Sequence, residues 1–369
     1  MNRMKQIMKR VTDLLTSFAL LALLSGCDVH EWPEQPETVP LLLKLEYETD
    51  LPVWEHSYSG RSVKARGMVT PGVSTWYAVT RGGTNQGIKG KIRYLIRVYP
   101  RQANNGESFR HVEEFLLYKE LGQGYNHEVR IDLPPGDYTV MVWSDLLEKE
   151  GDTPYYNANN FGEITFQNGH KGNTDYRDAF SGKRDVSLTG CIFERETETL
   201  TVSMTRPLAK FEFITTDLLE FFENELTRVM MKNGGQPDDG DVTRSVNLDT
   251  YKVQFHYVGF MPDAYSLFTG KPVDSSTGVS FETTLKRLND AEASLGFDYV
   301  FMNSGDSSVS VQLAIYDNEG TPLSVTDPIE VPLKRSSHTI MCGKFLTSET
   351  SGGIHINPDY DGDHNLIIP

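Results

Sequence analysis

The chain contains little cysteine, fewer basic than acidic residues and no long apolar run. It has 3 Cys among 369 residues, which excludes the dense disulfide framework of small secreted domains. Acidic residues outnumber basic ones by 51 to 35, and the net charge of −16 argues against a nucleic-acid partner, because nucleic acids are bound by positive surfaces. The apolar run at 14–24 is shorter than the ~20 residues that a membrane-spanning helix needs, and no later run approaches that length.

The common catalytic motifs are also missing from the sequence. It has no G-x-S-x-G, no phosphate-binding G-x-x-x-x-G-K-[ST] and no H-E-x-x-H, and its nine His are scattered without metal-binding spacing. We therefore predict that the protein is not an enzyme and holds no metal or cofactor. An exported hydrolase remains an alternative, since a glycosidase needs only two carboxylates that the fold brings together.

The first 26 residues have the pattern of an export signal. Basic residues at 5, 9 and 10 precede the short apolar run, which ends at Leu24-Ser25-Gly26-Cys27. Small residues directly before a cysteine resemble bacterial lipoprotein signals, in which the peptide is cut before the cysteine and the cysteine is acylated. We expect Cys27 to be the lipid anchor, because two or more acyl chains hold a protein stably on a membrane. An ordinary cleaved signal with an incidental Cys27 is the alternative.

Residues 27–40 are rich in proline and acidic side chains, and this composition is typical of an extended linker. Acidic residues directly after a lipidated cysteine also resemble signals for the outer surface of Bacteroides-type bacteria. We therefore expect an outer-membrane, surface-exposed location.

Strand patterns dominate the rest of the chain. Alternating apolar residues and turn signals predict strands at 41–48, 92–99, 112–118, 127–133, 138–144, 199–205, 208–215, 251–260, 298–303, 309–317, 329–334 and 338–346, with at most one short strand at 163–167 between 144 and 182. One helix is predicted to begin at Asp217 and end at Asn233-Gly234, and Leu285 and Leu288 mark a second short helix or an irregular edge. The fold class is all-β, with one antiparallel β-sandwich domain at 41–205, a second at 206–369 and the helix in the second. Cys191 and Cys342 fall in different domains, so we expect two separate buried thiols rather than a disulfide.

Two short segments are candidate binding sites. Tyr155 and Tyr156, beside several Asn, are candidate glycan contacts, because aromatic rings stack on sugars. Asp359 to Asp363 has alternate carboxylates that could converge on Ca²⁺, but its glycine stands at the fourth loop position instead of the sixth, so we interpret it as an acidic turn.

Four segments together resemble the fimbrillin-like lipoproteins of Bacteroides-type bacteria. They begin at Cys27-Asp28-Val29-His30-Glu31-Trp32-Pro33, Leu133-Pro134-Pro135-Gly136-Asp137-Tyr138, Arg206-Pro207-Leu208-Ala209-Lys210-Phe211 and Val331-Pro332-Leu333-Lys334-Arg335. The resemblance implies two transthyretin-like sandwiches and a role as stalk subunit, tip or anchor of a surface pilus. The implied partners are other pilus subunits and outer-membrane lipid, and host glycan or protein is a further possibility.

The resemblance also implies a maturation step. In that family, stalk subunits look to be cut by an arginine-specific protease after the first strand, and a neighbour's strand fills the groove that is freed. Arg66 before Gly67 is the candidate cut site here, whereas an anchor would stay uncut. The terminal residues 365–369 could donate a strand or complete their own sheet, and we expect the latter. A glycan-binding lipoprotein of a polysaccharide-uptake system is the alternative function.

Overall fold

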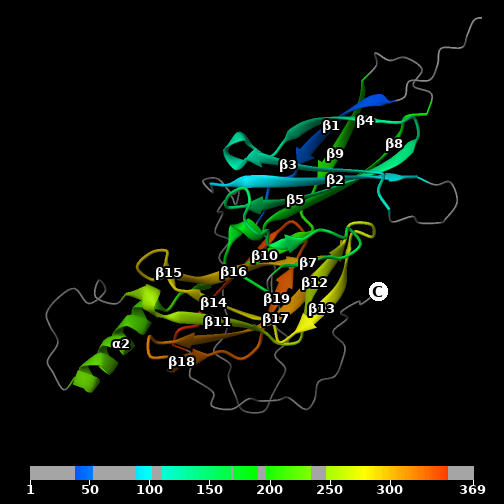
Figure 1. Cartoon of the computed structure of the whole chain (residues 1–369). Helices are drawn as coiled ribbons and strands as arrows, with labels where there is room; N and C mark the ends of the chain where they lie inside the picture. The colour runs from blue at the N-terminus through cyan, green and yellow to red at the C-terminus, as the bar shows by residue number, and fades with distance from the viewer. Residues whose placement is uncertain are drawn as a thin grey trace, which may run out of the picture.

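The structure, a computed structural model, describes residues 38–52, 89–101, 110–167, 169–189, 197–233 and 247–347. These residues form five β-sheets and one α-helix, α2 (Leu218–Asn233). Within these ranges, the prediction of an all-β fold with one helix is therefore confirmed. Figure 1 shows the sheets gathered in two halves, with α2 at the end of the second half that lies away from the first.

Two sheets face each other in the first half. Sheet I has the order β4-β1-β9 and sheet II the order β3-β2-β5-β8. Their strands are β1 (Val39–Tyr47), β2 (Lys91–Pro100), β3 (Glu113–Glu120), β4 (His127–Leu133), β5 (Asp137–Leu147), β8 (Ala179–Ser187) and β9 (Glu198–Met204). Alternate apolar residues of both sheets meet in one core between them, as period-2 strands with one buried face require.

Two further sheets face each other in the second half. Sheet III has the order β15-β16-β10-β20, and sheet IV has the order β14-β11-β17-β18 with β19 also paired to β17. Their strands are β10 (Leu208–Thr215), β11 (Lys252–Tyr257), β14 (Ser280–Thr284), β15 (Lys286–Arg287), β16 (Ala293–Phe301), β17 (Ser307–Tyr316), β18 (Pro322–Val325), β19 (Ile329–Leu333) and β20 (His338–Gly343). Leu218, Phe221 and Phe222 of α2 join the aromatic-rich core between these sheets.

The fifth sheet connects the two halves. Sheet V has the order β13-β12-β7-β6 and consists of β6 (Tyr156–Asn157), β7 (Ile164–Phe166), β12 (Phe260–Ser266) and β13 (Lys271–Thr277). A third core joins its side chains to Trp143 of sheet II and to Phe301 of sheet III. The predicted boundary at 205/206 stays a prediction, but β7 precedes it and pairs with β12, which follows it.

The two halves place their first strands alike. β1 lies between antiparallel β4 and parallel β9, and β10 lies between antiparallel β16 and parallel β20. In each half, the opening strand is thus central and pairs in parallel with the strand that closes the half. Period-2 patterns did not predict these parallel pairs, because alternation reports which face is buried and says nothing about strand direction.

Most predicted strands lie within a few residues of the observed ones, and β4 and β10 match at both ends. The single strand predicted at 251–260 is wrong, because the chain turns at Gly259 (φ 109°) between β11 and β12. The helical alternative for 285–288 is also wrong, since Lys286–Arg287 forms the edge strand β15. β8 and β13 were missed because their polar sequences lack the apolar alternation of a half-buried strand.

The start of α2 agrees with the prediction in part. The N–H of Phe221 donates to the carbonyl of Asp217 (2.9 Å), so Asp217 is the residue that directly precedes and caps the helix at Leu218. The Asp217 carboxylate, however, accepts hydrogen bonds from Leu346 N (3.2 Å) and Thr347 N (2.8 Å). Its side chain therefore fastens the segment after β20 to the start of the helix.

Gly182 allows sheets I and II to meet at one corner. A Cβ built at this position would lie 2.7 Å from Met204 Sδ and 2.8 Å from the carbonyl oxygen of Ser203. We expect Gly182→Ala to lower the free energy of unfolding by about 1–3 kcal/mol through overpacking, measured by urea denaturation. Gly122→Ala is the matched control, because the added methyl meets nothing within 4 Å. Equal stability of the two variants would contradict the close approach of β8 and β9.

Candidate functional site

The candidate site is the position of β1 between β4 and β9, which we call the β1 slot. Leu41, Leu43 and Leu45 have exposures of 0%, 0% and 1%, and all three enter the core between sheets I and II. Leu43 lies opposite Val129 of β4 and Leu200 of β9. β1 therefore supplies main-chain hydrogen bonds to two neighbours and one row of core side chains.

The residues that follow β1 are bound by a buried arginine at the junction of the halves. Arg206 donates hydrogen bonds to the carbonyls of Thr49 (2.8 Å) and Asp50 (2.7 Å), with a longer one to Glu48 (3.4 Å). Its other donors bind both carboxylate oxygens of Asp178 at 2.8–3.0 Å. We call Arg206 and Asp178, with the carbonyls they hold, the Arg206 site.

The Arg206 site is buried and charged. Arg206 and Asp178 side chains are each 1% exposed, and the guanidinium lies 4.6 Å from the ring centroid of Phe180. Burial alone would lower the pKa of Arg206, but the charge and hydrogen bonds of Asp178 outweigh it and raise the pKa. A guanidinium that stays charged with paired donors forms strong, directional bonds, so it fixes the 48–50 backbone firmly.

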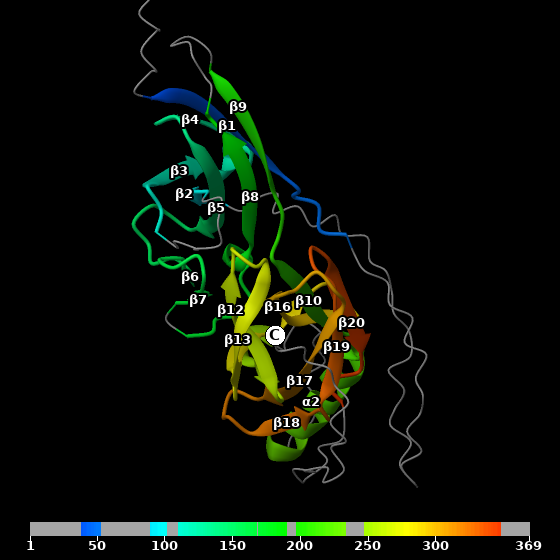
Figure 2. The same ribbon diagram turned by 90° about the vertical axis from the view of Figure 1, so that its right-hand side faces the viewer.

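A second contact ties the same segment to the second half. The N–H of His338, at the start of β20, donates to the carbonyl of Pro52 (2.9 Å), and the Leu51 side chain between the two contacts is buried. Figure 2 shows this segment, in blue, running from β1 along the side of the molecule toward β20. Residues 48–52 thus connect the β1 slot to sheet III.

The imidazole of His338 gives this contact a pH dependence. Burial, with a smaller contribution from Lys210, lowers the pKa of His338 to about 3, although Asp175 acts in the opposite direction. Nε2 lies 3.5 Å from Glu212 Oε2, and it makes no hydrogen bond within the described residues. The folded protein therefore holds a neutral imidazole at pH values where an unfolded chain takes up a proton.

We expect acid to destabilise the protein partly through His338. Between about pH 6.5 and pH 3 only the unfolded state binds this proton, so the stability falls by up to ~1.4 kcal/mol per pH unit from this group. His338→Gln should flatten the plot of unfolding free energy against pH in that window. His256→Gln, at a half-buried position on β11, is the control. Parallel plots for wild type and His338→Gln would reject this assignment.

A second buried charge cluster lies at the junction of the halves. Asp298 of β16 accepts hydrogen bonds from Arg177 and from the hydroxyl of Tyr257, and its carboxylate contacts His170. Burial alone would raise the pKa of Asp298, but the charge of Arg177 and these bonds lower it. Arg177 also donates to the carbonyl of Tyr299 (3.1 Å). The cluster joins the segment around residue 177 to sheet III.

The structure tests only some of the site residues expected from sequence. Cys27, Arg66, Cys191, Asp359–Asp363 and residues 365–369 lie outside the described residues, so those expectations stay predictions. Cys342 is buried beside Ile214 and Ile340. Within the described ranges, no group of three or more His, Cys, Asp or Glu could hold a metal ion, and no helix has the length and apolarity to cross a membrane.

The two candidate glycan residues differ in their surroundings. Tyr156 has 0% exposure, its ring packs against Trp143 (centroids 5.3 Å apart), and its hydroxyl donates to the carbonyl of Arg177. A sugar could stack on this ring only if the ring left the core. Tyr155 is half-buried beside it, and its role as a glycan contact stays a prediction.

Sequence reasoning missed Arg206 as a site residue. It placed the boundary between two domains directly before Arg206, where the residue before a proline is restricted to extended geometry. A charged residue at a junction between apolar strands was the available signal. Its partners could not be predicted, since Asp178 and residues 48–50 are distant in sequence.

Comparison with known proteins gives a family and several distant structures. No curated protein matches the chain. It is similar to a candidate adhesin from Bacteroides ovatus (13% identity, TM-score 0.39, covering 83% of this chain and 86% of that one). It is also similar to the fimbrial anchor protein Mfa2 from Porphyromonas gingivalis (9%, 0.35, 78% and 82%) and to a fimbrial assembly protein from Parabacteroides distasonis (14%, 0.35, 85% and 93%). A family model described as a family of unknown function, DUF6562, matches residues 43–369, and the chain therefore belongs to that family.

Proposed function

We propose that this protein is a cell-surface lipoprotein that works as a subunit, tip or anchor of a pilus and assembles through β-strand addition. The observation that carries the proposal is the position of β1. It is the first described strand of the chain, yet it lies in the centre of sheet I with alternate side chains in the core.

Strand addition is the physical basis of the proposed assembly. A slot between β4 and β9 without β1 would expose two rows of unpaired main-chain groups and a row of empty apolar positions. An extended strand from another subunit can pair with the main-chain groups and fill the apolar positions. Its main-chain bonds give affinity and its alternate side chains give specificity. β10 occupies the equivalent position in the second half, but residues 205–207 join it directly to β9 of the first half.

Attachment to the membrane is the second part of the proposal. We assign the anchor to acyl chains on Cys27, joined to the body by the linker predicted at 27–40, whose last two residues belong to β1. Labelling cells with a palmitate analogue should mark the wild-type protein and leave Cys27→Ala unmarked. A wild-type protein without label would reject the lipid anchor.

The position in the pilus follows from the N-terminus of the surface protein. A sequence that begins at Cys27 means that β1 is retained and the protein acts as an anchor. A sequence that begins at Gly67 or nearby means that β1 is removed and the slot is open for a neighbour, as in a stalk or tip. High-mass ladders on unboiled gels are expected in the second case. Monomeric protein together with a start near Gly67 would contradict assembly through the β1 slot.

A further inference from the structure

A pocket lies at the junction of the halves, apart from the β1 slot. Its volume is about 330 Å³, which is at the small end of the range for ligand pockets. β8 supplies one side through Ser181 and Lys183, together with Thr205, which directly follows β9. The turn after β12 supplies another side through Thr269. Arg335, in the turn between β19 and β20, closes a third side.

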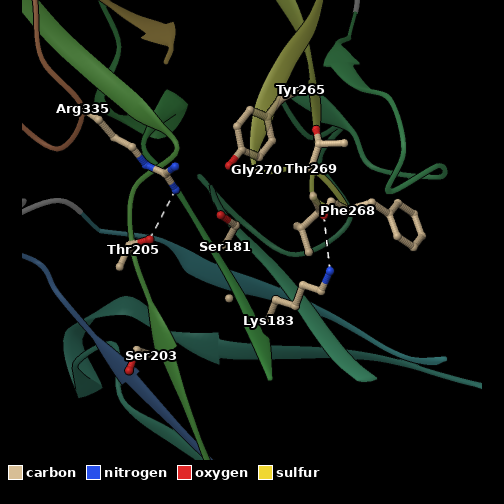
Figure 3. Close-up of a pocket in the computed structure, with 11 residues that line it drawn as sticks. Ser181, Lys183, Ser203, Thr205, Tyr265, Phe268, Thr269, Gly270 and Arg335 are labelled. Atoms are coloured by element: carbon tan, nitrogen blue, oxygen red, sulfur yellow. Dashed lines mark hydrogen bonds between the residues drawn. The ribbon is translucent and has the colours of Figure 1, made fainter. Parts of the chain in front are cut away.

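The charge of this pocket is opposite to that of the whole chain. Acidic residues outnumber basic ones by 51 to 35 in the sequence. Among the described residues that line the pocket, however, the charged side chains are Lys183 and Arg335, and no Asp or Glu is present. Figure 3 shows these two side chains on opposite sides of Ser181. The Lys183 side chain extends toward Phe268, so the two cations give the lining positive charge at two separate places.

Both cations are positioned by neighbours that leave donors available. Arg335 donates from Nε to the carbonyl of Arg206 (2.8 Å) and from Nη2 to Thr205 Oγ1 (3.4 Å), and within the described residues Nη1 has no partner. Lys183 Nζ donates to the carbonyl of Phe268 (3.3 Å), which uses one of its three hydrogens. The pocket therefore offers a fixed guanidinium and an ammonium. Its described lining contains no carboxylate that would neutralise them.

The rest of the lining is suited to a hydroxylated ligand. Ser181, Ser203, Thr205 and Thr269 carry hydroxyls that both donate and accept hydrogen bonds, and Leu267 adds an apolar surface. We propose that this pocket binds a small carboxylate that also carries hydroxyl groups, of the uronic acid class. Lys183 and Arg335 would take the carboxylate, and the hydroxyl side chains would take the sugar hydroxyls.

Calorimetric titration of the purified full chain tests this assignment. D-glucuronate should bind at least ten-fold more tightly than glucose, which lacks the carboxylate, and than acetate, which lacks the hydroxyls. Failure of glucuronate to bind overturns the proposal. Equal affinity for acetate would show a simple anion site, and equal affinity for glucose would show that the cations are not used; either result overturns the assignment to a uronic acid.

Two lysine variants locate the binding. Lys183→Gln should weaken glucuronate binding at least ten-fold, whereas Lys271→Gln, which removes the same charge from exposed β13, should leave it unchanged. Lys183 is also exposed, so neither replacement disturbs a core. Wild-type affinity in Lys183→Gln would place the ligand elsewhere and overturn the assignment.

A galacturonic acid trisaccharide that binds more tightly than its monosaccharide would identify a polysaccharide as the source. The test does not depend on pilus assembly.

Discussion

Replacement of Arg206 by methionine is expected to lower the free energy of unfolding by about 3–5 kcal/mol. The variant leaves Asp178 charged and buried without its partner, and it removes the donors to the carbonyls of Thr49 and Asp50. A buried charge that loses its partner keeps its full desolvation cost, which is why the effect is larger than the value of the ion pair itself. Urea denaturation followed by circular dichroism measures the change.

Two further variants separate the causes of this effect. Arg206→Met combined with Asp178→Asn should recover part of the loss, because no unpaired charge remains. Arg130→Met should change stability by no more than about 0.5 kcal/mol, since the side chains of Arg130 and Asp132 are 64% and 56% exposed and 3.8 Å apart. A cost below about 1 kcal/mol for Arg206→Met would show that the 48–50 backbone does not depend on this residue.

Leu43→Asp in β1 is expected to have the second large effect, a loss of at least about 4 kcal/mol of stability. Leu43 has 0% exposure and packs in the core between sheets I and II, so the carboxylate would be buried without a partner. If β1 is released by this change, the first half should become sensitive to proteases while the second half stays protected. Limited proteolysis with mass spectrometry distinguishes the halves.

The neighbouring residue provides a matched control. Leu42 is half-buried on the other face of β1 and lies opposite Arg130 of β4. Leu42→Asp introduces the same charge one residue away, where an opposite charge directly across the strand pair is favourable. We expect it to cost less than about 1 kcal/mol. Equal destabilisation by the two variants would contradict the observed register of β1.

The sequence predicted those parts of the fold that depend on local pattern. β4 and β10 match at both ends because their apolar residues alternate and turn residues bound them. β8 did not show this pattern, since Gly182 stands in its interior and charged residues occupy its second half. Its strand conformation comes from pairing with β5, a tertiary effect that overrides local preference.

The candidate site was less predictable than the fold. The apolar run at 41–48 indicated a first strand, but its central place between β4 and β9 depends on pairing with residues about 85 and 157 positions later. For Tyr156, the local sequence was a misleading indication of exposure. Its loop-like sequence suggested an exposed aromatic pair, whereas the third core covers its ring. The polar residues around Tyr156 therefore did not indicate whether its ring is exposed.

Exchange of β1 for a labelled peptide tests strand addition most directly. The chain would be opened with a site-specific protease at a recognition sequence inserted at Arg66, and then incubated with a fluorescent peptide of residues 38–52. This peptide carries both the β1 side chains and the carbonyls that Arg206 binds. Size-exclusion chromatography measures the label that elutes with the protein. We expect the wild-type and Leu42→Asp peptides to enter the protein and the Leu43→Asp peptide to stay out. Exclusion of all three peptides, or equal entry of all three, would contradict strand addition.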